Sequence, residues 1–161
     1  MMLKVMDLLK LIALDDDDLK VVSAHLQDAV LKVEDMAYIP RERRFAALLN
    51  RFDWLTADEN IAANGGHFER RRCALRFEKV HHAQFKALSL ENSAQVLELL
   101  SVIFDPGEAP SGFITLTFAG GPAVRLQVDC IEAELRDLGP SWKTARKPEH
   151  PDDDNNSDLS S

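Results

Sequence analysis

Apolar and polar residues alternate along most of the chain from Val30 to Val128, which is the pattern of β-strands that bury one face. The pattern is clearest over residues 31–54, where two apolar runs flank the polar segment 40–43. The second run is apolar on both faces, as in a strand at the centre of a sheet. We therefore predict a hairpin with a short polar turn, whose first strand points inward with Leu31, Val33, Ala37 and Ile39.

Further apolar or alternating runs predict strands at 9–14, 71–80, 83–90 and 96–104. In the strand predicted at 71–80, Cys73, Leu75 and Phe77 are expected to face inward. A second hairpin is expected from 113–118 and 124–128, because an Ala-Gly-Gly-Pro turn separates two apolar runs that are in phase.

Two helices are predicted, one before and one after most of these strands. Asp15 to Asp18 precede a helical apolar face formed by Leu19, Val22, Leu26 and Ala29. The four aspartates also suggest a cation site, but the glycine and the distal glutamate of a calcium loop are missing, so helix capping is the favoured interpretation. Asp129 is expected to cap a closing helix that ends at Gly139 and Pro140 and whose core face is Ile131, Leu135 and Leu138.

These elements predict an α+β fold that is mostly antiparallel β, with about seven strands in two sheets or in a partly open pleckstrin-homology-like barrel, one helix near the N-terminus and one closing helix at the C-terminus. The alternative is an open antiparallel sheet with both helices on one face. Length favours one domain over residues 1–142. Residues 143–161 are rich in Pro, Asp, Asn and Ser and are predicted to form a disordered acidic tail. The segment 55–69 is predicted to be a mobile loop.

The charge distribution changes the picture of what this fold binds. The formal net charge is -8, which argues against charge-driven binding of nucleic acid or of an anionic membrane. Eight of the eleven arginines nevertheless lie between residues 41 and 76, a segment without lysine. Arginine is suited to bidentate pairing with carboxylate or phosphate groups.

The arginine cluster is the candidate binding site. It comprises two groups, Arg41, Arg43 and Arg44 at the predicted hairpin turn and Arg70, Arg71 and Arg72 before a later strand. If the two strands are neighbours, the six side chains converge on one surface that binds an anion or an acidic partner. The other interpretation is ion pairing within the same protein, to Glu42, Asp53 and Glu69, which contributes little when the pairs are exposed.

No catalytic or metal motif stands out. The chain has no phosphate-binding glycine loop, nucleophile elbow or HExxH sequence, so we expect no catalytic residue and no cofactor. His81 and His82, with His67, do not have the spacing of a zinc site, and neighbouring strand residues point to opposite faces. Cys73 and Cys130 are expected to pack as small apolar residues, Cys130 being the better thiolate candidate.

The cellular setting is also bounded by the sequence. Two cysteines form no disulfide framework, which indicates a reducing compartment. The first residues are interrupted by Lys4, Asp7 and Lys10 and do not resemble a signal peptide, and no run is long enough to span a membrane. We expect a cytoplasmic protein.

Four segments resemble a known family. They are HLQDAVLKVEDMAYIPRERRFAALLNRFDW at 25–54, RRRCALRF at 70–77, CIEAELRDLGPSWKT at 130–144 and KPEH at 147–150. The likeness is to domain-of-unknown-function family 2948, an alphaproteobacterial family, and it extends from about Lys10 to His150. The resemblance implies a bacterial cytoplasmic protein and carries over no activity, cofactor or catalytic residue.

From these observations we expect a small, non-enzymatic protein-interaction domain that uses the arginine-rich edge. Its partner would be an acidic protein segment or a second copy of the chain. The alternative is a domain that binds an anion or a nucleotide-type ligand with the same arginines.

Overall fold

The computed structural model describes residues 8–53, 68–139 and 142–144, with side chains described for 8–53 and 70–139. The elements are, in chain order, β1 Lys10–Ala13, α1 Asp16–Leu26, β2 Val30–Lys32, the 3-10 turn η1 Val33–Asp35, β3 Met36–Ile39, the 3-10 turn η2 Pro40–Glu42, β4 Arg44–Phe52, β5 Phe68–Phe77, β6 Val80–Lys86, β7 Val96–Pro106, β8 Gly112–Phe118, β9 Ala123–Val128, β10 Ala133–Asp137 and β11 Trp142–Thr144.

The predicted N-terminal helix is confirmed as α1. Its N-cap is Asp15, whose side chain accepts a hydrogen bond from the backbone N–H of Asp18 at 2.8 Å. Three further aspartates in the first turn are favoured by the helix dipole. The helix buries Leu19, Val22 and Leu26, as its apolar spacing predicts.

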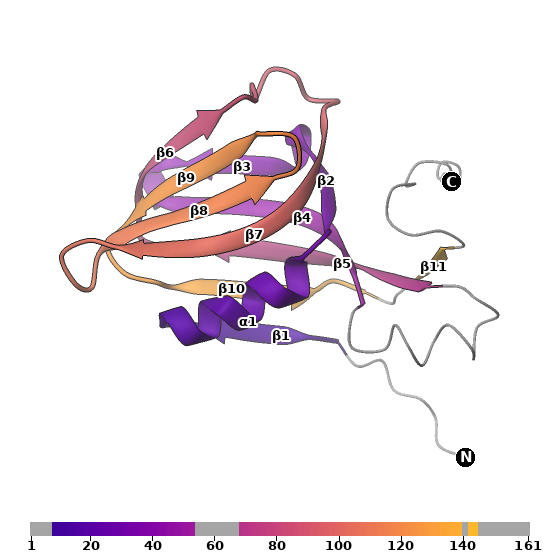
Figure 1. The fold of residues 1–161 in the computed structure, drawn as a ribbon, viewed down its shortest axis with the longest axis horizontal. Coiled ribbons are helices and arrows are strands. Elements are labelled where there is room, and N and C mark those ends of the chain that lie inside the picture. The colour runs from indigo at the N-terminus through magenta and orange to yellow at the C-terminus, as the bar shows by residue number, and fades with distance from the viewer. Residues whose placement is uncertain (1–7, 54–67, 140–141, 145–161) are drawn as a thin grey trace, which may run out of the picture.

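The eleven strands form one continuous antiparallel sheet in the order β1-β10-β5-β4-β2-β7-β8-β9-β6, with β3 paired to β4 and β11 paired to β5. Figure 1 shows that this sheet folds over, so that the layer β7-β8-β9-β6 faces the layer β3-β4-β5-β10, with α1 and β1 at one end. Inward side chains of both layers and of α1 make one hydrophobic core, in which Phe45, Phe77 and Phe118 are fully buried. The mostly antiparallel fold with one N-terminal helix is therefore confirmed. The division into two sheets of about seven strands is wrong.

The two predicted hairpins are present, but one of them has a different phase. In β8 and β9, Ile114 pairs with Leu126 and Leu116 with Val124, as predicted. In the first hairpin, η1 separates β2 from β3 and shifts the alternation. Met36 is therefore buried, whereas Ala37, which was predicted to point inward, is exposed.

The predicted closing helix is wrong, because the residues that were assigned to it form β10. Ala133 and Leu135 are buried at a spacing of two, and Asp137 continues this period as a buried charged residue. Since aspartate was counted as polar, the alternation was hidden, and Ile131, Leu135 and Leu138 gave a false helical spacing. No helix follows α1 within the described residues other than the two 3-10 turns.

Two other predictions lie mostly outside the described residues. The loop 55–69 is described only from residue 68, where β5 begins, and the tail 143–161 only to residue 144, where β11 ends. The single domain and the disordered tail stay predictions.

Gly112 begins β8 where the chain turns back from β7, and it lies against backbone. A Cβ at this position would come within 2.5 Å of the carbonyl oxygen of Asp105 and 2.7 Å of the Phe104 ring. We expect Gly112→Ala to lower the free energy of unfolding by about 1–3 kcal/mol, because backbone must move. Gly139→Ala is the matched control, since no atom of the described residues, apart from its chain neighbours, lies within 4 Å of its added Cβ. Urea unfolding of both variants checks this, and equal losses would contradict it.

Candidate functional site

The first arginine group lies at the corner between β3 and β4. Pro40 begins η2, and Arg43 follows it in the left-handed region with φ 51°, its N–H donating to the carbonyl of Pro40 at 3.0 Å. The carbonyl of Arg43 accepts from the N–H of Val80 at 2.9 Å, which attaches this corner to the start of β6. We call Arg41, Arg43, Arg44 and Lys79 the hairpin corner.

Within the hairpin corner, Arg44 is fixed and the other cations are not. Arg44 Nε donates to Glu78 at 2.9 Å, and its Nη1 donates to Glu42 at 3.1 Å. Glu78 also pairs with Arg76 Nε at 2.8 Å. Arg41, Arg43 and Lys79 are exposed, and their side chains have no hydrogen-bond or ion-pair partner among the residues that the structure describes.

A groove of about 410 Å³ lies at this corner. All of its lining residues are charged, namely Glu42, Arg43, Arg44, Arg76, Glu78, Lys79 and Glu132. Most small-molecule sites are largely apolar. An all-charged groove instead suits the charged surface of another macromolecule.

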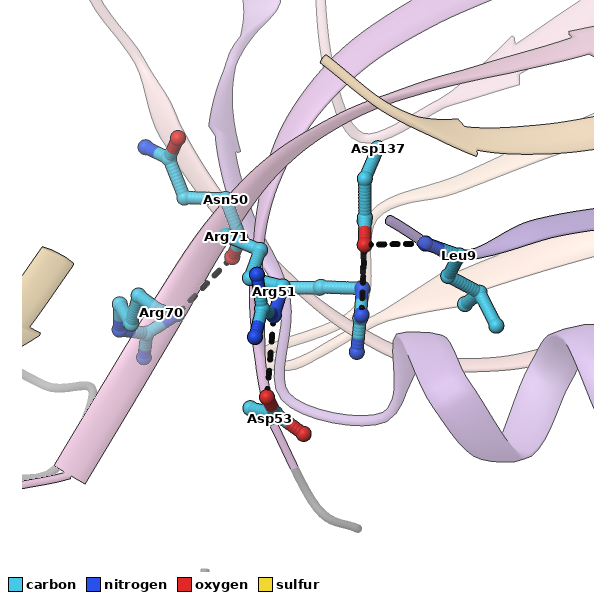
Figure 2. Close-up of polar contacts among 7 residues, drawn as sticks. All are labelled: Leu9, Asn50, Arg51, Asp53, Arg70, Arg71 and Asp137. Carbon is cyan, nitrogen blue, oxygen red and sulfur yellow. Dashed lines mark hydrogen bonds and ion pairs between the residues drawn. The ribbon is translucent and has the colours of Figure 1, made fainter. Parts of the chain in front are cut away.

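The second arginine group is engaged within the protein (Figure 2). Arg70 is 5% exposed, donates from Nη1 to the carbonyl of Asn50 at 2.9 Å, and stacks over the Phe52 ring at 6.0 Å. Arg71 Nε pairs with the buried carboxylate of Asp53 at 3.0 Å. Arg72 Nη1 donates to the side-chain oxygen of Asn50 at 3.1 Å.

The two arginine groups do not converge. In the β4–β5 ladder, Phe45 pairs with Phe77 at one end and Phe52 pairs with Arg70 at the other. Seven residues of strand separate these ends, a distance of about 23 Å. One small ligand cannot reach both groups, so the surface that the six arginines were predicted to share divides into the hairpin corner and the Arg70–Arg72 cluster.

Beside that cluster lies an ion pair that sequence reasoning missed. Arg51 donates from Nε and Nη2 to the two carboxylate oxygens of Asp137 at 2.9 and 3.0 Å, and both residues are buried. Asp137 also accepts from the backbone N–H of Leu9 at 2.8 Å. Burial alone would lower the pKa of Arg51, but the hydrogen bonds and charge of Asp137 outweigh it and raise that pKa. The sequence did hold a signal for this pair. Leu49, Arg51 and Asp53 stand at alternate positions, so the strand face that is apolar at Leu49 carries charged residues at the next two inward positions.

Burial shifts the pKa values of the thiol and of the helix histidine near this pair. Burial raises the pKa of Cys73 to about 12, so its thiol stays protonated and packs as a small apolar side chain, as predicted. His25 has its pKa lowered by burial and then by the charge of Arg51, against the opposing charges of Asp137 and Asp53. Its Nδ1 and the Nη1 of Arg51 are buried and have no hydrogen-bond partner within the described residues.

The two histidines of β6 form no ligand set with other described residues. His81 contacts the carboxylate of Asp129 through Nε2, and His82 is exposed on β6, while His67 lies outside the described residues. In the part of the chain that the structure describes, no three His, Cys, Asp or Glu side chains are grouped to hold a metal ion. Within the same residues, no helix has the length and apolar character needed to cross a membrane.

A family model described as "Protein of unknown function (DUF2948)" matches residues 9–150. The chain belongs to this family. The match covers the β1 strand, both arginine groups and the Arg51–Asp137 pair, and it confirms the resemblance found in the sequence. No curated protein and no solved structure matches the chain. A DUF2948 description assigns no activity, so function is argued from the geometry.

The Arg51–Asp137 pair allows a direct test of what stabilises the sheet. Removing one partner leaves a buried unpaired charge, so we expect Arg51→Met or Asp137→Leu alone to lower the free energy of unfolding by about 3–5 kcal/mol. The double variant should lose clearly less than the sum, because no charge is left unpaired. Urea unfolding of the four proteins measures this cycle, and additive losses would show that the pair is not coupled.

His25 makes stability depend on pH. Because its pKa in the folded protein is lowered from the ordinary value of 6.5, the unfolded chain takes up a proton at acidic pH that the folded chain does not. The free energy of unfolding should therefore be unaffected by this group above about pH 7 and should fall as pH drops below about 6.5. His25→Gln should lose less stability over that range in urea unfolding, whereas His82→Gln, at an exposed position, should behave as the wild type.

Proposed function

We propose that this protein is a small non-enzymatic interaction domain that binds an acidic segment of a partner protein at the hairpin corner. The observation that carries the proposal is that Arg41, Arg43 and Lys79 are exposed beside an all-charged groove, with side chains unpaired within the described residues. Guanidinium groups pair with carboxylates in a bidentate geometry, which gives orientation as well as affinity.

The fixed neighbours support this proposal. Glu78 is shared by Arg44 and Arg76, so these two arginines are satisfied and form the wall of the groove. Glu132 is the carboxylate in the groove without an ion pair among the described residues. Unpaired cations therefore exceed unpaired carboxylates at the corner, although the chain as a whole is acidic. At physiological salt, charges more than about 8 Å apart are largely screened, so the local excess decides what binds.

The proposal includes a cytoplasmic, bacterial setting, supported by the two free thiols of Cys73 and Cys130. A pleckstrin-homology-like arrangement of the strands stays a prediction of topology and adds no ligand.

A peptide-binding experiment tests the acidic partner. The full chain is titrated into a fluorescent peptide of alternating Glu and Ser, with a Lys and Ser peptide for comparison. We expect selective binding to the acidic peptide that weakens with salt, and Arg41→Glu with Arg43→Glu should weaken it by about tenfold or more.

The matched control exchanges two cations of the opposite layer, Lys86→Glu with Arg125→Glu, on β6 and β9. These should leave the affinity within about twofold of the wild type. Equal loss in both double variants, or no selectivity between the peptides, would contradict the proposal. The ligand-binding alternative makes a different prediction. Inorganic phosphate or a nucleotide would stabilise the wild-type chain against unfolding, Arg41→Glu with Arg43→Glu would abolish this effect, and the acidic peptide would not bind.

A further inference from the structure

The outer face of the β3-β4-β5 layer carries a second groove, of about 430 Å³, with an apolar floor. In this floor Ala37 pairs with Ala46 across β3 and β4, and Leu48 pairs with Ala74 across β4 and β5. Ala37 is exposed and the other three are half-buried. A solvated sheet face usually alternates with polar residues, and alanine is depleted in strands. The small side chains of the three alanines let another backbone approach closely.

The two ends of this groove are lined by side chains of opposite charge. Arg44 and Arg76 line the basic end, where they pair with Glu42, Glu78 and Glu134, and Glu34 and Asp35 line the acidic end, where Arg72 lies 3.9 Å from Asp35. The β3–β4 register sets their separation, because Ile39 pairs with Arg44 whereas Met36, next to Asp35, pairs with Ala47. The ends are therefore about 10 Å apart along β4. Beyond the basic end lies the exposed Arg43 of the hairpin corner.

We infer that a second copy of the chain docks on this face. Two copies related by a two-fold axis that runs across the strands bring the alanine floors together with β4 antiparallel to its counterpart. Arg43, beyond the basic end of each copy, then faces Glu34 at the acidic end of the other, which is the self-complementarity that a two-fold interface requires. This inference rests on the proposed function, since it identifies the acidic segment as the Glu34–Asp35 turn of the second copy.

The charges that select this partner are the unpaired ones. Glu34 is exposed, and its carboxylate has no partner in the described ranges 8–53, 68–139 and 142–144. Arg43 is also exposed, and its side chain is unpaired within those ranges. Neither side chain supports the fold, so reversing its charge leaves the monomer intact. Arg43 already has a positive φ of 51°, and glutamate tolerates that region no worse than arginine.

Sedimentation equilibrium of the full chain at physiological salt tests the inference. We expect a reversible dimer for the wild type and a loss of about tenfold or more in dimer affinity for Arg43→Glu and for Glu34→Arg alone. The double variant, Arg43→Glu with Glu34→Arg, should return to within about threefold of the wild type, because each contact is formed again with its charges exchanged. Arg125→Glu and Glu108→Arg, away from this face, are the matched controls and should not change the dimer.

A monomer at every concentration, a dimer that is insensitive to both single reversals, or a double variant weaker than either single one would overturn the inference. The acidic-peptide titration separates this failure from that of the proposed function. A monomeric chain that still binds the peptide through Arg43 leaves the proposed function standing, whereas a chain that neither dimerises nor binds the peptide overturns both. Circular dichroism of the variants shows that each is folded as the wild type.

Discussion

The layer β3-β4-β5-β10 depends on the ion pair between Arg51 and Asp137, two residues 86 positions apart in the chain. Both side chains are almost entirely removed from water, a state that costs free energy unless each charge meets the other with good geometry. The two parallel hydrogen bonds supply that geometry, and the Leu9 N–H satisfies a further lone pair of the carboxylate. One carboxylate thereby ties β10 to β4 and aligns the start of β1 beside it (Figure 2).

The end of the β4–β5 ladder that holds this pair also provides partners for the second arginine group. Arg70, Arg71 and Arg72 lie at the same end of the β4–β5 ladder as Arg51, where Asn50, Asp53 and Phe52 provide partners. Charge at that end is used to build the fold. At the other end the ladder finishes in a turn with few partners, and the cations of the hairpin corner stay in contact with solvent. The same residue type therefore has a structural role at one end of the layer and is accessible at the other.

The fold could be predicted from the sequence wherever the buried side chains are all apolar. The β8–β9 hairpin and α1 were found because every inward position is apolar and the helix has an aspartate cap. The strand β10 was missed because Asp137 occupies an inward position, and its partner Arg51 lies too far along the chain to be recognised as such. The phase of β3 was missed because η1 inserts a turn inside a run that looks continuous.

The sequence predicted which residue type forms the candidate site, but it did not predict how those residues are arranged in space. An excess of arginine between residues 41 and 76 can be counted in the sequence. Whether two arginine groups meet depends on strand register, which is set by pairing over long distances in the chain. The antiparallel β4–β5 ladder puts the beginning of one strand beside the end of the other, and this separates the groups.

The joint between the two layers has a consequence for how the molecule holds together. Only β2 connects β4 to β7 in the ladder, and it pairs with β4 at a single position, Val30 with Asn50, and with β7 at three. The Val80 N–H to Arg43 carbonyl bond at the hairpin corner adds a backbone link between β4 and β6, so backbone bonds join the layers at few points. Between those points the layers are held by the phenylalanine, leucine and valine side chains packed between them, so the curvature of this sheet depends on its core as well as on its ladder.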